Sequence, residues 1–166
     1  MNSRKYRQVL TGLLSLILVA VLAIAPTNPA LAADYSSRNL KGVDFSGQDL
    51  TNSQFTRTDM REGNLSYANL RQVSLFGAKL MSANLEGADL TYAVLDLARL
   101  EKANLTNAIL EGALAFNAQF NGAIIDGADF TDVLLKLNTQ EQLCEVAKGT
   151  NPITGRDTRE TLLCDY

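Results

Sequence analysis

The chain has 166 residues, with 15 Lys+Arg, 18 Asp+Glu, and neither histidine nor tryptophan. Without histidine, Ser-His-Asp and Cys-His catalytic groups are impossible, and histidine-based zinc sites are excluded. The net charge of −3 argues against binding nucleic acid through its phosphates, because that mode of binding needs an excess of lysine and arginine.

Residues 1–32 have the pattern of a cleavable signal peptide. Three basic residues among the first seven precede an apolar run over residues 9–25, and residues 30–32, Ala-Leu-Ala, form a small-x-small cleavage site. The alternative is a permanent membrane anchor, but the run is short for a bilayer span. Cleavage would lower the Lys+Arg count from 15 to 12 against 18 Asp+Glu, a net charge of −6. We expect an exported protein with no stable membrane insertion after cleavage.

Residues 38–137 carry a period of five. Large apolar residues occupy nineteen of the twenty positions counted in fives from Leu40 to Leu135, and the exception is Ala115. In an α-helix each step of five advances by about 140° around the axis, which scatters these residues over every face. In a straight strand an odd step sends successive residues to opposite faces. Both conflicts disappear if the chain turns a corner once per five residues and points each central residue at a shared axis.

Two other positions of the repeat agree with such a coil. The residue two places before each centre is alanine at most positions from Ala68 to Ala128, and small residues there suit a narrow, closed interior. Glycines lie two places after a centre, where a corner would be. They are Gly42, Gly47, Gly77, Gly87, Gly112, Gly122 and Gly127.

The repeated units resemble the pentapeptide repeat family. The resemblance is carried by units such as Ala83-Asn84-Leu85-Glu86-Gly87, followed by Ala88-Asp89-Leu90. It implies an all-β solenoid, a right-handed quadrilateral β-helix with four repeats per coil and about five coils in all, stabilised by contacts between neighbouring coils. We expect a lead-in over residues 33–37 and the β-helix over residues 38–137.

Residues 138–166 predict a short α-helical cap. Residues 138–149 indicate one helix with a polar start and a glycine stop, and Asp157 and Glu160 have capping-box spacing before a second helical turn. Cys144 and Cys164 are the only cysteines. An even pair in an exported protein predicts a disulfide that pins the cap over the last coil, with a redox-active pair as the alternative.

Stacking of residues twenty apart would gather acidic side chains on one wall, opposed only by Arg71. They are Asp49, Asp89, Glu111, Asp129 and Asp132, with Thr131 beside them. We interpret them as solubilising charges. Two alternatives are a weak calcium site near Glu111, Asp129 and Asp132, and a carboxylate pair of Asp89 and Asp129 about 10 Å apart. The neighbouring wall stacks three asparagines, Asn64, Asn84 and Asn104, and predicts a ladder of side-chain hydrogen bonds.

A further wall carries apolar residues at outward positions. They are Phe76, Val94, Leu97, Leu114, Phe116, Leu134 and Leu137. Contiguous exposed apolar surface marks either a partner site or a surface covered by another part of the chain. The tail helix could cover this wall, and Ala115 could mark a register shift that turns Leu114 inward.

These features favour a non-catalytic exported structural or interaction protein. Its rigid β-helix would present flat walls to a protein partner, with no cofactor and no nucleic acid. The tail from Leu143 to Cys164 resembles that of thylakoid-lumenal members of the family, which favours the lumen over a periplasm. The alternatives are an acidic DNA mimic that binds a nucleic-acid enzyme, as some cytoplasmic members of the family do, and a weak divalent-metal-binding protein.

Overall fold

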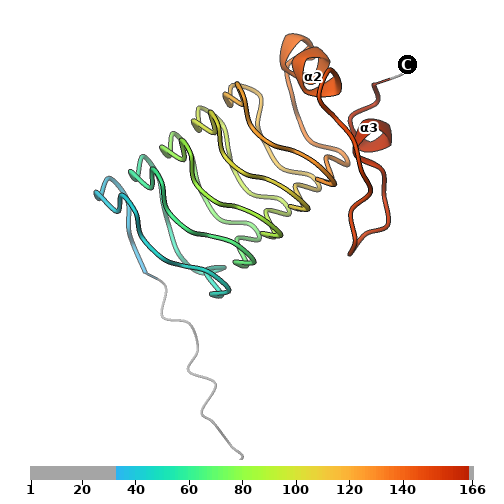
Figure 1. The fold of residues 1–166 in the computed structure, drawn as a ribbon. Helices are drawn as coiled ribbons and strands as arrows, with labels where there is room; N and C mark the ends of the chain where they lie inside the picture. The colour runs from blue at the N-terminus through green and yellow to red at the C-terminus, as the bar shows by residue number, and fades with distance from the viewer. Residues whose placement is uncertain (1–32, 165–166) are drawn as a thin grey trace, which may run out of the picture.

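The computed structural model describes residues 33–164, a stack of coils around one axis with helices at the C-terminal end (Figure 1). The expected signal peptide over residues 1–32 lies outside the described residues. Parallel backbone bridges link residues twenty apart, from Asp34 with Gln54 to Leu114 with Leu134. The described repeats contain isolated bridges rather than longer strands, because a turn follows every bridge. A bridging period of twenty and a turn in every five residues make four sides per coil.

The four sides stack into four walls, which we name A to D. Each five-residue side has an inward central residue, with two residues before it and two after it. Wall A has the centres Leu40, Met60, Leu80, Leu100 and Phe120; wall B has Phe45, Leu65, Leu85, Leu105 and Ile125; wall C has Leu50, Leu70, Leu90, Leu110 and Phe130; wall D has Tyr35, Phe55, Leu75, Leu95, Ala115 and Leu135. Walls D and A share an edge in every coil.

The corner explains why one residue of most units has a positive φ. In the unit around Leu85, the Ala88 amide donates to the Leu85 carbonyl at 3.0 Å, and Gly87 has φ +63°, as the third residue of a type II turn requires. Other residues also adopt this conformation, such as Tyr67 with φ +58°. Glycine at 87 also leaves room for the Tyr67 ring in the preceding coil, since a Cβ there would lie 2.6 Å from that ring.

The backbone amides of a unit explain its Asn or Asp. The Asn84 amide donates to the Gly63 carbonyl in the preceding coil at 2.8 Å, and the Leu85 amide donates to Asn104 in the following coil at 2.7 Å. The Glu86 amide faces the corner and donates to the Asn84 side-chain oxygen at 3.1 Å. The residue before the centre therefore satisfies an amide that no neighbouring coil reaches.

The interior consists of the large central residues and the small residues before them. Centres from Phe55 to Leu110 are fully buried, and the alanines from Ala78 to Ala113 are at most 1% exposed. The predicted asparagine ladder is confirmed: Asn84 donates to Asn64 at 3.4 Å, and Asn104 donates to Asn84 at 3.2 Å.

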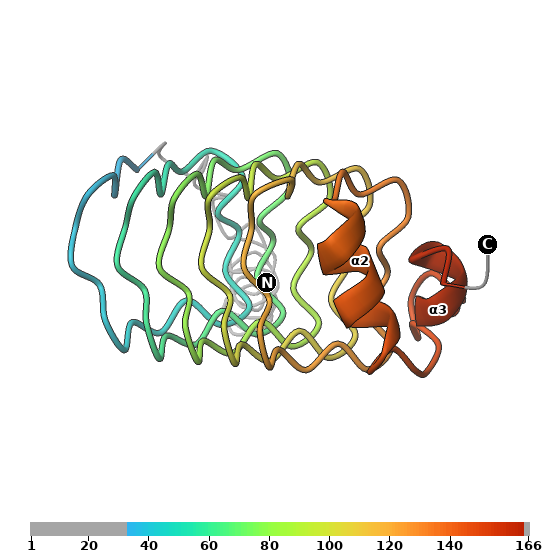
Figure 2. The same ribbon diagram turned by 90° about the horizontal axis from the view of Figure 1, so that it is seen from above.

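The two ends of the stack are closed differently. At the N-terminal end the Tyr35 ring stacks on Phe55, with ring centres 5.0 Å apart. At the other end lie two helices, α2 over Leu137–Cys144 and α3 over Thr158–Thr161. Figure 2 shows both helices at the same end of the stack. Among the described residues, no helix is long and apolar enough to cross a membrane.

The tail agrees with the prediction in part. Helix α2 ends at Cys144, so the predicted helical end at 149 is wrong. Beyond α2 the chain instead pairs with the last coil, where the Gly127 amide donates to the Lys148 carbonyl at 2.8 Å. Asp157 caps α3, because its side chain accepts from the Arg159 amide at 2.9 Å. The predicted disulfide between Cys144 and Cys164 is confirmed, with Cα atoms 5.4 Å apart.

We expect Leu105→Ala to lower the free energy of unfolding by about 2–5 kcal/mol, because it removes a fully buried centre and leaves a cavity that four walls cannot fill. Leu105 is 0% exposed. Ile124→Ala is the matched control, since Ile124 lies on the same wall and is 51% exposed; its change should stay within about 0.5 kcal/mol. Urea unfolding followed by circular dichroism measures both, and equal losses would contradict the inward orientation of Leu105.

Candidate interaction surface

Wall D carries an apolar column on its outer surface. Val94 bridges to Leu114, and Leu114 bridges to Leu134, so the three side chains stack in register on consecutive coils. Leu114 is 46% exposed and Leu134 is 53% exposed, while Val94 is half-buried. Parallel pairing holds such neighbours about 4.8 Å apart, so the column forms a continuous apolar strip on a flat face.

Further apolar residues extend the strip to the edge between walls D and A. Leu97 and Phe116 are exposed there, and Leu137, the first residue of α2, is 69% exposed. Phe76 is half-buried in the coil before them. The Lys136 ammonium group lies 5.3 Å from the centre of the Phe116 ring. The seven residues predicted for this surface therefore lie on wall D, and we call them together the wall D patch.

The sequence left two ways for this surface to be hidden, and neither occurs in the described residues. Ala115 is fully buried while Leu114 is exposed, so the local register does not shift. The tail does not cover the column, because Leu114 and Leu134 are about half exposed, although α2 lies beside Leu97 and Phe116 at the edge of the wall. The Phe130 amide donates to the Thr161 hydroxyl at 3.1 Å, which places the tail on wall C.

Val94, Leu114 and Leu134, which form the wall D column, cannot accept a hydrogen bond from a backbone amide of their own unit. In most units of walls B and C the residue before the centre is Asn or Asp and accepts an amide two residues later, as Asp89 does from Thr91 at 3.0 Å. Each of those walls has one exception, Ile124 on wall B and Ile109 on wall C. Where Val94, Leu114 and Leu134 take that position, the amides of Asp96, Phe116 and Lys136 have no hydrogen-bond partner within the described protein. These apolar residues therefore leave a backbone amide of their unit without an acceptor, and they expose apolar area to water. The stability of the unit does not explain their presence.

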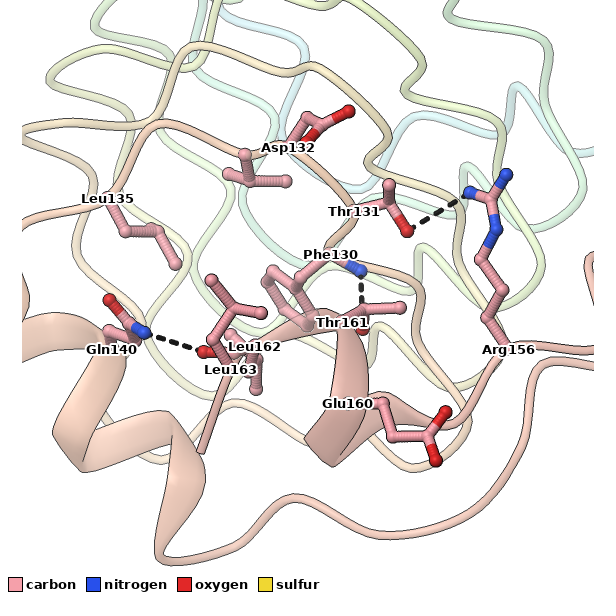
Figure 3. A pocket seen from close by; sticks show the side chains of 11 residues that line it. Phe130, Thr131, Asp132, Leu135, Gln140, Arg156, Glu160, Thr161, Leu162 and Leu163 are labelled. Carbon is pink, nitrogen blue, oxygen red and sulfur yellow. Dashed lines mark hydrogen bonds between the residues drawn. The ribbon is translucent and has the colours of Figure 1, made fainter. Parts of the chain in front are cut away.

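The acidic residues of wall C gather around a cation that the sequence did not indicate. The Arg156 Nη1 atom lies 2.7 Å from Glu111 Oε2 and 3.2 Å from Asp129 Oδ2, and it donates to the Thr131 hydroxyl at 3.0 Å (Figure 3). Asp132 makes no ion pair or side-chain hydrogen bond within the described protein. The region predicted for calcium is therefore occupied by a guanidinium group, and the described residues contain no cluster of three acidic or cysteine ligands suited to a metal ion.

The pKa of Asp129 lies below its ordinary value despite burial. Burial of the fully enclosed carboxylate acts to raise the pKa, but hydrogen bonds from Thr131 and the charge of Arg156 outweigh it. The pKa of Asp89 is lowered in the same way, with burial opposed by Thr91 and Arg71. Both carboxylates are thus held in the ionised form, and Ile109 lies between them in the column.

Asn151 is a second tail residue that the sequence did not indicate. Its buried amide nitrogen donates to the carbonyls of Asn107, Ala108 and Gly127 at 2.9–3.3 Å. Asn151 and Arg156 form hydrogen bonds with residues 24 to 45 positions away in the chain, and no spacing rule links them to the repeats. They fasten the tail to walls B and C.

A cavity of about 410 Å³ lies between the last coil and the tail (Figure 3). Phe130, Leu135 and Leu163 line it with Arg156, and Gln140 of α2 closes one side by donating to the Leu162 carbonyl at 2.6 Å. Its lining combines apolar side chains with a guanidinium group that is already paired with two carboxylates.

Comparison with known proteins places these features in a family. The model of pentapeptide repeats matches residues 39–77, 78–114 and 98–136. A solved structure of a pentapeptide repeat protein from the Arabidopsis thaliana thylakoid lumen is 46% identical, covers 78% of this chain and 90% of its own, and superposes with a TM-score of 0.77. Such neighbours imply a right-handed β-helix solenoid.

Two curated Arabidopsis thaliana proteins match a shorter segment. The thylakoid lumenal protein TL20.3 is 50% identical over 36 residues, 22% of this chain, and the thylakoid lumenal 15 kDa protein 1 is 54% identical over 37 residues, also 22% of this chain. The matches span only 13% and 16% of those proteins. Together with the solved structure they support a location in the thylakoid lumen rather than a periplasm.

We expect Arg156→Met to lower the free energy of unfolding at neutral pH by about 1–3 kcal/mol, because the buried Asp129 carboxylate loses a charged partner. The lowered pKa of Asp129 means that its contribution is present above the ordinary aspartate pKa of about 3.9 and is lost as the pH falls through the lower folded-state pKa. The difference between wild type and variant should therefore shrink on acidification.

Urea unfolding at neutral and acidic pH measures this difference. Lys148→Met is the matched control, because Lys148 pairs with Asp126 at 3.3 Å with side chains 72% and 42% exposed. Its effect should be below about 1 kcal/mol. A loss in Arg156→Met that is as large in acid as at neutral pH would show that packing, not the ion pair, carries the effect.

Proposed function

This chain belongs to the pentapeptide repeat family, and from that premise we propose that it is a non-catalytic protein of the thylakoid lumen that binds a protein partner through wall D. The observation that carries the proposal is the wall D patch, where Leu114 and Leu134 are about half exposed in one in-register column. A contiguous apolar strip of this kind on a face that the described tail leaves open is typical of an interaction site.

The rigidity of the coil suits a scaffold. Each unit uses its amides toward the preceding coil, the following coil and its own corner, as the amides around Leu85 do. Because neighbouring coils cover one another, a wall cannot bend without breaking several hydrogen bonds at once. A partner would therefore meet a preformed flat surface and would lose little affinity to ordering of the rod.

Neither alternative function, calcium binding or DNA mimicry, is supported by an observation as specific as the wall D patch. The calcium proposal has to displace Arg156 from Glu111 and Asp129, where its guanidinium group makes two ion pairs. A DNA mimic requires acidic surface, which walls B and C carry, but it does not account for the basic residues of wall A. They are Arg38, Lys41, Arg61, Lys79, Arg99 and Lys102, against three acidic residues.

The finer architecture forms part of the same proposal. We propose a signal peptide over residues 1–32, a lead-in over 33–37, a quadrilateral β-helix of about five coils over 38–137 and a disulfide-closed cap over 138–166. Bridges between residues twenty apart and the helices α2 and α3 support this division.

We expect Leu114→Glu and Phe116→Glu to leave the melting temperature within a few degrees of wild type but to abolish retention of a lumenal partner, because each places a charge in the centre of the apolar strip. Ile124→Glu is the matched control: Ile124 has the same place in its unit, lies on wall B and is 51% exposed. The measurement is affinity capture from a lumen fraction by immobilised residues 33–166. Unfolding of the wall D variants, or equal loss in Ile124→Glu, would contradict the proposal.

A further inference from the structure

The four walls differ sharply in charge. Wall A carries six basic and three acidic residues, and wall D carries two of each. Wall B carries three acidic residues and no basic one, and wall C carries five acidic residues against Arg71 alone. The described part of an acidic protein thus has one basic wall, and that wall shares an edge with the wall D patch.

The three acidic residues of wall A neutralise only three of its six basic residues. Each is in an ion pair: Asp59 with Arg61 at 2.6 Å, Glu62 with Lys41 at 3.0 Å, and Glu101 with Arg99 at 2.8 Å. The exposed residues Lys79 and Lys102 on wall A make no ion pair within the described protein, and neither do Arg57 and Lys136 on the shared edge. Positive charge is therefore in excess beside the apolar strip.

The backbone of wall A departs from the repeat in the same coils as that of wall D. Lys79, Arg99 and Gln119 replace the Asn or Asp before the centre, so the amides of Met81, Glu101 and Asn121 have no hydrogen-bond partner within the described protein. Walls B and C retain Asn or Asp at most of these positions. The two departing walls are neighbours, and together they offer apolar area, cations and amide donors without acceptors.

A groove at the shared edge joins the two walls. It has a volume of about 430 Å³ and lies between α2 and the last coils. Leu97, Phe116 and Lys136 line it from wall D, Gln119 from wall A, and Gln142 from α2. Apolar and cationic groups therefore face the same space.

We propose that the protein partner bound through wall D is acidic, and that its carboxylates extend across the shared edge onto wall A to pair with Lys79, Lys102, Lys136 and Arg57. This inference rests on the proposed function. Charge complementarity selects an acidic partner, because the exposed donors and cations beside the strip lack acceptors. The strongly acidic walls B and C repel the same partner, so charge also directs it to one side of the rod.

A carbodiimide that joins amines to carboxylates in direct contact tests the inference. Residues 33–166 are treated with it in a lumen fraction, and cross-linked peptides are sequenced by mass spectrometry. We expect amide links from Lys79, Lys102 or Lys136 to aspartate or glutamate of the captured protein. Links only between lysines of that protein and Asp44, Asp49 or Glu86, on walls B and C, would overturn the inference.

Variants then separate this inference from the proposed function. We expect Lys79→Gln with Lys102→Gln to weaken binding of the identified partner about tenfold at low salt and much less at high salt, because such charges act through screened electrostatics. Lys148→Gln, on the tail, should have no effect. If Leu114→Glu abolishes binding but the double lysine variant does not change it, the proposed function stands and the acidic partner is excluded. If neither change matters, both proposals fail.

A lipid surface is the competing occupant. Cosedimentation of residues 33–166 with vesicles of phosphatidylglycerol in phosphatidylcholine, lost in both Leu114→Glu and the double lysine variant, would overturn the inference in favour of an anionic membrane. Absence of cosedimentation, together with the cross-links described above, supports an acidic protein.

Discussion

The structure depends on the satisfaction of backbone amides in a chain that turns every five residues. Around Leu85 one amide donates backward to Gly63, others donate forward to Asn104 and Thr106, and one closes the corner. The remaining amide, that of Glu86, has no coil within reach and uses the Asn84 side chain. The Asn or Asp of the repeat is therefore a structural requirement of the turn, as the large centre is a requirement of the interior.

This requirement makes the exceptions informative. A side chain other than Asn or Asp before a centre leaves an amide without its local acceptor, so its presence has to be explained by something outside the unit. On wall D the exceptions include the apolar residues Val94, Leu114 and Leu134, which follow one another in the column, and on wall A they include the basic residues Lys79 and Arg99. Walls B and C have one exception each, Ile124 and Ile109. Conflict between a local rule and the observed residue is expected where a protein meets a partner.

The tail pairs with the last coil, whose backbone hydrogen-bonding groups would otherwise have no partner from a following coil. Gly127 donates to Lys148 and Phe130 donates to the Thr161 hydroxyl, as the next coil would accept from them. Arg156 and Asn151 fasten this substitute coil, and the disulfide between Cys144 and Cys164 joins α2 to the chain beyond α3. Arg156 and Asn151 hold the closure on walls B and C, and α2 lies beside the edge between walls D and A. The wall D residues Leu114 and Leu134 stay about half exposed.

The sequence by itself determined the period, the inward centres, the corners and the asparagine ladder, because each follows from a local pattern repeated at fixed spacing. It also determined the cysteine pair, because the chain has only two cysteines. It also indicated the wall D patch, because stacking at twenty residues turns spacing into adjacency. Only the tertiary structure decided that the tail leaves that patch exposed, that α2 ends at Cys144, and that Arg156 occupies the acidic corner of wall C. The physical reason is that the tail has no repeat: the hydrogen bonds of Asn151 and Arg156 join residues 24 to 45 positions apart, and side-chain geometry in the folded state, not spacing, selects among them.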